Sequence, residues 1–206
     1  MEQRLLTALL GTVCILLVIP TVGCLIHLIR TAILRVIGQA VGGETAWFIA
    51  NRATFLGVVH HECAHALVAV LTGGKVEQMQ LFHPQGDQLG CVIWRPRRLY
   101  PGACAIQYTL VSIAPVVFGC CNVYLLWNNI FPLCTRAWQM LLLGYVMLSI
   151  FIQSTMSRQD VRVAAKGLPV CAVIIFAVLL VTGADVCAWL LHTDWQGVLE
   201  HVLGTA

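Results

Sequence analysis

Long apolar runs separated by short polar segments dominate the chain. A helix needs roughly 17 to 25 mainly apolar residues to cross a bilayer. Five segments meet that requirement, at residues 5–29, 45–71, 101–130, 137–153 and 168–191. The pattern predicts an all-α polytopic membrane protein with about five transmembrane helices.

Two stretches between these runs have a different pattern. Residues 30–43 alternate basic and apolar positions and end at Gly42-Gly43, which indicates an interfacial amphipathic turn or helix. Residues 75–95 lack a helical stripe and contain the turn sequence Pro84-Gln85-Gly86-Asp87. They predict a membrane-associated β-hairpin between the second and third spans, with strands at roughly 75–82 and 90–95. An ordinary connecting loop fits this pattern equally well.

Composition supports the membrane class. Of 206 residues, 59% are hydrophobic and 10% are charged, whereas about a quarter of an average soluble protein is charged. We expect one membrane-embedded domain over residues 1–206, with its core at about 45–191 and the first span plus the interfacial segment at 1–44. The net charge of +3 comes without a basic run, so nucleic acid is not expected as a partner.

The ten cysteines do not form a recognisable framework. Most lie inside apolar runs, and their spacing contains no CxxC pair. We interpret them as small apolar packing residues.

The distribution of Lys and Arg predicts the orientation. One side holds the amino terminus, the hairpin and the loop before the last span, with Arg4, Lys75, Arg95, Arg97, Arg98, Arg158, Arg162 and Lys166. The other side holds Arg30, Arg35 and Arg136. We therefore expect a multi-pass protein of the cell membrane whose amino terminus is cytoplasmic and whose carboxyl terminus is outside.

Within the second span lies His61-Glu62-Cys63-Ala64-His65. Helical residues four apart share a face, so His61 and His65 can direct their imidazoles at one point. Two imidazoles at this spacing suit a zinc ion, with Glu62 beside them as a general base. Ionisable groups are costly at membrane depth unless they are paired or bind metal. The alternative is that hydrogen bonds with neighbouring helices satisfy all three groups.

A catalytic zinc usually has three protein ligands. Asp160 begins a membrane helix on the predicted side of His65, whereas Asp185 lies near the far end of the last span. The spacing of Ser157 and Asp160 is also that of a capping box. Asp160 is therefore either a helix cap or the third ligand, and the histidine pair at the same depth favours the ligand.

These residues resemble the site-2 protease family of intramembrane zinc metalloproteases, in particular its small bacterial members. The similarity covers roughly residues 45–167. The matching stretches are 61–67, 71–76, the Pro/Gly-containing 114–119, and Ser157-Arg158-Gln159-Asp160. The last resembles a Ser-x-x-Asp element that replaces Leu-Asp-Gly in some members, although Val161 follows here instead of Gly.

The resemblance implies hydrolysis of peptide bonds in membrane-embedded or membrane-adjacent protein substrates. Zn²⁺ held by His61, His65 and Asp160 would activate a water, and Glu62 would transfer its proton. A substrate unwound from its helix could pair with the 75–95 hairpin inside the lipid bilayer. In the family, polar residues of the helix after the hairpin help to hold the substrate or the oxyanion, which makes Asn122 a candidate for substrate binding.

Two other functions are compatible with the same residues. One is a catalytically inactive membrane adaptor with a vestigial zinc site. The other is a metal or proton transporter that uses the four ionisable residues as a relay. The transporter is less favoured because the sequence shows no internal repeat.

Overall fold

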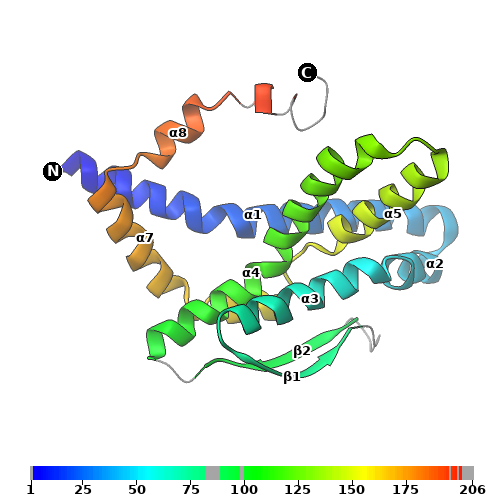
Figure 1. Cartoon of the computed structure of the whole chain (residues 1–206), viewed down its shortest axis with the longest axis horizontal. Helices are drawn as coiled ribbons and strands as arrows, with labels where there is room; N and C mark the ends of the chain where they lie inside the picture. The colour runs from blue at the N-terminus through cyan, green and yellow to red at the C-terminus, as the bar shows by residue number, and fades with distance from the viewer. Residues whose placement is uncertain (1, 82–88, 98–99, 195, 199, 201–206) are drawn as a thin grey trace.

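The computed structural model describes residues 2–81, 89–97, 100–194, 196–198 and 200. It is predominantly helical, with one two-stranded sheet (Figure 1). Within the described residues, Glu2–Val41 and Pro101–Leu133 are each long and apolar enough to cross a membrane, and three bent helix pairs bring the total to as many as five. The all-α membrane fold with a hairpin is confirmed.

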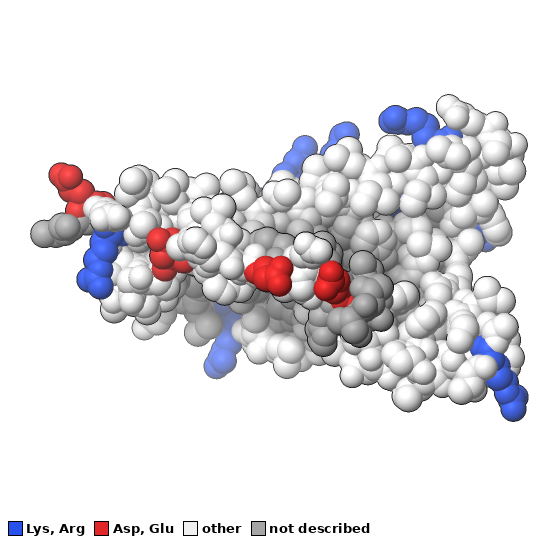
Figure 2. Space-filling model, turned by 90° about the horizontal axis from the view of Figure 1, so that it is seen from above, with Lys and Arg blue, Asp and Glu red and all other residues white. Residues whose placement is uncertain are grey.

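The outer surface suits a lipid environment. Large apolar side chains are exposed along the first helix and on later ones, as at Leu28, Leu141 and Val181. Figure 2 shows that the face seen from above carries few Lys, Arg, Asp or Glu side chains, and these are scattered. Such a surface is typical of a protein whose solvent is the bilayer.

The first helix is longer than the pattern predicted. α1 runs without interruption over Glu2–Val41, so residues 30–41 continue the first span instead of forming a separate interfacial element. No helix-breaking residue intervenes between Ile29 and Val41 except Gly38, which a helix tolerates. The predicted break at Gly42 is present, with a φ of 89° that favours glycine. The short α2 (Gly43–Phe48) follows it.

The second predicted span is bent. A π-helical turn, η1 (Ile49–Ala53), leads from α2 to α3 (Phe55–Leu71), and the two parts meet at 48°. At the start of α3, the backbone N–H of Gly57 donates to the Ser149 hydroxyl at 2.8 Å. A Cβ at Gly57 would overlap the carbonyl of Ser149, so glycine is what allows α3 to approach α5 (Ala137–Gln153) this closely.

The hairpin is confirmed, with strands slightly shorter than predicted. β1 (Lys75–Gln80) pairs antiparallel with β2 (Cys91–Arg95), in a register that places Lys75 opposite Arg95 and Gln80 opposite Cys91. The predicted turn at residues 84–87 lies outside the described residues. The sheet lies along α3 (Figure 1).

A buried glutamine ties the hairpin to the helices. Gln107 of α4 (Pro101–Leu125) donates to the hydroxyl of Thr72 at 2.9 Å and accepts from the backbone N–H of Arg97 at 3.2 Å. Thr72 ends α3 and Arg97 follows β2. One side chain thus holds both ends of the hairpin against the helical core.

Helix α4 continues through η2 (Leu126–Ile130) and η3 (Phe131–Leu133) into the turn before α5. After α5, the chain bends by 60° into the short α6 (Arg158–Ala164). This bend corresponds to the polar interruption that separates the fourth and fifth apolar runs in the sequence. It places α6 beside α4.

The last predicted span consists of two helices. α7 (Leu168–Thr182) ends at Gly183, which has a φ of 70°, and α8 (Val186–His192) begins after a bend of 78°. A Cβ at Gly183 would lie 3.0 Å from the guanidinium of Arg4. The end of α7 therefore lies beside the start of α1. The last span predicted from the sequence would instead have ended on the side of the membrane opposite the amino terminus.

Candidate active site

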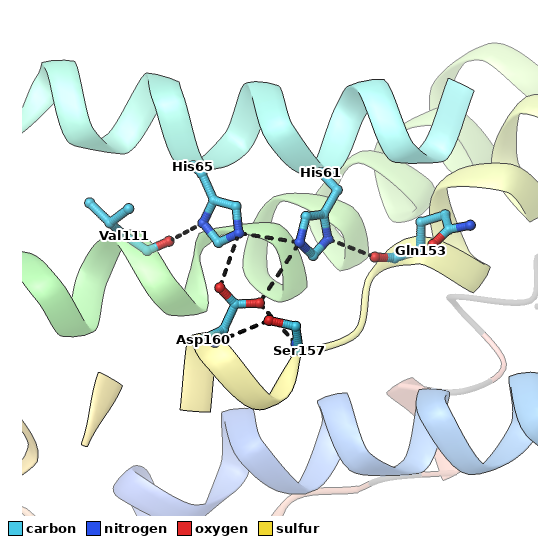
Figure 3. A network of polar contacts seen from close by, with 6 residues as sticks. All are labelled: His61, His65, Val111, Gln153, Ser157 and Asp160. Atoms are coloured by element: carbon cyan, nitrogen blue, oxygen red, sulfur yellow. Dashed lines mark hydrogen bonds and ion pairs between the residues drawn. The ribbon is translucent and has the colours of Figure 1, made fainter. Parts of the chain in front are cut away.

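The site begins with one face of α3. His61 and His65 are one helical turn apart, and their Nε2 atoms lie 3.2 Å from each other. Their rings meet edge to face, with centroids 4.8 Å apart. His65 and the neighbouring Glu62 are buried, each 8% exposed. The predicted convergence of the two imidazoles on one point is present (Figure 3).

Helix α6 brings a carboxylate to the same point. Asp160 Oδ1 lies 3.4 Å from His65 Nε2, and Oδ2 lies 3.9 Å from His61 Nε2. Asp160 also completes a capping box, since its Oδ2 accepts from the Ser157 N–H at 2.8 Å and its own N–H donates to the Ser157 hydroxyl at 3.1 Å. The sequence left open whether Asp160 caps its helix or faces the histidines. In the structure Asp160 does both.

Backbone carbonyls determine which nitrogen of each imidazole carries the proton. His61 Nδ1 is 2.9 Å from the carbonyl oxygen of Gln153, and His65 Nδ1 is 2.7 Å from that of Val111. A carbonyl oxygen only accepts, so each Nδ1 must donate. In a neutral imidazole the Nε2 atom is then left with a lone pair. Both Nε2 atoms face the Asp160 carboxylate (Figure 3).

This arrangement favours a cation at the centre. Two Nε2 lone pairs and a carboxylate repel one another at these separations unless positive charge lies between them. Ligand atoms around a tetrahedral zinc ion lie about 3.3–3.6 Å apart, close to the separations of the three side chains. Among the described residues, His61, His65 and Asp160 form the group of three potential ligands able to share a metal ion, with ligand atoms within 4.8 Å of one another. Nitrogen and oxygen donors of this kind fit Zn²⁺.

The three side chains open onto a cavity of about 640 Å³. Glu62 lies in its wall next to both histidines, and residues 89–92 and 94 of the hairpin form another side. At Gly90 the backbone passes so close to Glu62 that an added Cβ would lie 2.7 Å from Cγ and 2.9 Å from Oε1. The backbone just before β2 thus limits the space available to the Glu62 carboxylate.

Asn122 lies elsewhere. Its Nδ2 is 2.8 Å from His60 Nε2, and it is not among the described residues that line the cavity. Its predicted contact with substrate therefore stays a prediction, without support from this placement.

Asp185, the other acid near a span end, caps α8 by accepting from the N–H of Ala188 at 2.9 Å. Cys63 is exposed on the opposite face of α3.

Several contributors to the site were not predicted from the sequence. The carbonyls of Val111 and Gln153 are backbone groups, so no side chain in the sequence points to them. Pro115 and the end of α5 are indirect signals that these carbonyls lack a helical partner. Proline has no N–H and leaves the carbonyl four residues earlier without its helical partner, and the last carbonyls of any helix lack partners too. Gly90 and Arg30 also line the cavity.

The chain is similar to a known protein family. A family model described as Peptidase M50B-like matches residues 22–200. No curated protein and no solved structure matches the chain significantly. The matched range contains α3, the hairpin, α4 and α6, and therefore every side chain of the cluster.

Proposed function

Because the chain belongs to the M50B-like peptidases, the site-2 protease family, we propose that it is an intramembrane zinc metalloprotease of membrane protein substrates. The observation that carries the proposal is the convergence of two Nε2 atoms, whose Nδ1 atoms face backbone carbonyls, and a carboxylate beside a buried glutamate. Hydrogen bonds to the two Nδ1 atoms and to the Asp160 carboxylate, together with a shared cation, would stabilise His61, His65 and Asp160 at membrane depth.

His61, His65 and Asp160 would hold the zinc. A bound zinc would supply Lewis acidity, polarising the scissile carbonyl and activating a water. The Gln153 and Val111 carbonyls would keep both imidazoles in the ligating tautomer, and Ser157 would orient the carboxylate. Glu62 would accept the proton of the attacking water and pass it to the leaving amine.

The hairpin would present the substrate. A transmembrane helix must unwind before its peptide carbonyls become accessible, and its freed backbone groups then need partners. β2 lines the cavity at Cys91, Val92 and Trp94, and each strand of a two-stranded sheet has one unpaired edge. An extended segment added to that sheet would meet the metal ligands in the same cavity. The proposed setting is the cell membrane.

Glu62→Gln tests the proposal. The amide is nearly isosteric but cannot accept the proton, so the purified variant should fold and keep its zinc while losing cleavage of a co-expressed membrane substrate. Glu44→Gln, at the exposed start of α2, is the matched control and should leave cleavage unchanged. Cleavage retained by Glu62→Gln contradicts the proposed mechanism.

The same variant separates the alternatives. If wild-type protein cleaves no substrate and Glu62→Gln keeps full biological activity, the chain is an adaptor with a vestigial zinc site. Zinc-dependent flux into liposomes that is lost in Glu62→Gln would instead support a transporter. Zinc content should be measured in each case by elemental analysis of the purified protein.

A further inference from the structure

A charged side chain that the zinc chemistry does not use lies in the wall of the same cavity. Arg30 belongs to α1 and lines the same cavity as His61, Glu62 and Asp160. Within the described part of the chain its Nε is buried without a hydrogen-bond partner, and Nη2 lies 3.5 Å from the Asn51 side-chain oxygen. The ion pairs found among the described residues do not involve it.

This environment is unusual for an arginine in a membrane helix. An arginine that faces lipid extends its head toward the membrane–water interface, where water and phosphate satisfy it. Arg30 instead has a buried Nε and lines the cavity that holds the metal-ligand cluster. A guanidinium has five N–H donors and leaving them unpaired away from water is costly. An acceptor that enters the cavity would supply a partner for this guanidinium.

The charges around the cavity indicate the sign of that partner. Its described lining contains two cations, Arg30 and Arg158, and two acids, Glu62 and Asp160. A zinc ion would give the cavity an excess of positive charge. Anionic groups would then be attracted and cationic ones repelled.

We propose that Arg30 is a specificity-determining residue that binds a carboxylate of the peptide substrate. This proposal rests on the proposed function, since it assumes that the cavity receives a peptide. Arginine suits the role because its planar fork binds a carboxylate through two parallel hydrogen bonds. The carboxylate comes from an acidic side chain near the scissile bond or from a free carboxyl terminus.

Binding measured without hydrolysis tests the proposal independently of catalysis. The full chain carrying Glu62→Gln is reconstituted with zinc in phosphatidylcholine vesicles. The probes are short labelled apolar peptides, amidated at the end, with one Asp moved along the series, and a matched series with Asn. A further Asn peptide with a free carboxyl terminus distinguishes the two sources of the carboxylate. Fluorescence anisotropy gives the dissociation constants.

We expect at least one carboxylate-bearing peptide to bind about tenfold more tightly than its neutral match. Adding Arg30→Gln should reduce that preference to within about twofold, and Arg30→Lys should keep part of it because the charge remains. Arg35→Gln, one cation further along α1, is the control and should keep the full preference. Circular dichroism checks that each variant is folded, and Arg30→Lys carries the test if Arg30→Gln does not fold.

Three results would overturn the proposal. They are the absence of any carboxylate preference, a preference that survives Arg30→Gln, and an Arg30-dependent effect seen only when phosphatidylglycerol replaces phosphatidylcholine. The last would assign Arg30 to a lipid phosphate. A wild-type protein that shows the Arg30-dependent preference but cleaves none of the peptides would contradict the protease and leave the carboxylate site standing.

Discussion

Nδ1 of His65 donates a hydrogen bond to the carbonyl oxygen of Val111, 2.7 Å away on α4. That carbonyl is available because Pro115, four residues later in the helix, has no N–H to bind it. Both Val111 and Pro115 are almost fully buried, so water does not compete for the bond. A helix imperfection thus provides the acceptor that leaves His65 Nε2 free for a metal.

Pro115→Ala should weaken zinc binding more than it weakens the fold. The new N–H would compete for the Val111 carbonyl, and losing a partner that orients a ligand typically costs about 10- to 100-fold in metal affinity. Pro20→Ala makes the same change inside α1, outside the cavity lining, and should leave zinc affinity unchanged. Competition with a fluorescent zinc chelator measures the affinity, and thermal unfolding monitors the fold. Equal zinc affinities in the two variants would refute this role for Pro115.

Ser157→Ala should also lower zinc affinity. The Ser157 hydroxyl accepts from the N–H of Asp160 at 3.1 Å and so holds the carboxylate-bearing turn in place. Loss of a helix cap costs about 1 kcal/mol, and we expect a fall of about tenfold in zinc affinity beyond any change in stability. Ser157→Thr keeps the hydroxyl and should behave as wild type.

Asp185→Ala is the matched control for Ser157→Ala. It removes the cap of α8, where Asp185 accepts from Ala188, without touching the cluster. We expect similar destabilisation and unchanged zinc content, measured on the same purified samples. If both cap deletions reduce zinc alike, the effect of Ser157 is general unfolding.

The elements of the site that follow local rules could be predicted from the sequence. The spacing of His61 and His65 predicted that they share one face of a helix. The hydrophobic period and the turn residues located the hairpin to within two residues at each strand end. Asp160 could be singled out because few acids exist in the apolar chain. The family model, which matches residues 22–200, agrees with the recognised resemblance.

Other features depend on contacts that no local pattern encodes. The Gln153 and Val111 carbonyls are backbone groups, and their direction depends on how α5 and α4 pack against α3. The sequence pattern predicted that the first span ends just before Arg30. In the structure α1 continues past Arg30, and tertiary packing buries its Nε. The bend at Gly183 was missed because a single glycine in an apolar run does not reveal whether the helix continues.

Gly90→Ala should slow catalysis while preserving the metal site. The added Cβ would lie 2.7 Å from Glu62 Cγ and 3.0 Å from the Gln80 carbonyl oxygen, so the glutamate or the strand must move. Displacing a proton-transferring group by a fraction of an ångström to about 1 Å can cost up to roughly a hundredfold in rate. We expect kcat to fall about ten- to hundredfold with zinc content unchanged.

Gly144→Ala controls for the glycine substitution itself. Gly144 lies in α5, where an added Cβ meets nothing within 4 Å, and alanine there should leave the rate unchanged. Cleavage of one membrane substrate by both variants, at equal zinc loading, provides the comparison. A Gly90→Ala protein as fast as wild type would show that β2 does not restrict Glu62.

Metal removal should destabilise the wild-type protein but not a variant that lacks the third ligand. A ligand that binds only the folded state stabilises it by about 2.7 kcal/mol when present at a hundredfold excess over its dissociation constant. A chelator should therefore lower the unfolding midpoint of the wild type in proportion to its zinc content.

Asp160→Asn is the informative change, because the amide oxygen can still accept from the Ser157 N–H at the start of α6. It should keep the helix cap, lose most of its zinc and respond little to the chelator. Asp185→Asn, in the cap of α8, should respond as the wild type does. If Asp160→Asn keeps wild-type zinc content and the full chelator effect, the carboxylate 3.4 Å from His65 Nε2 is a cap alone and the third ligand must be sought elsewhere.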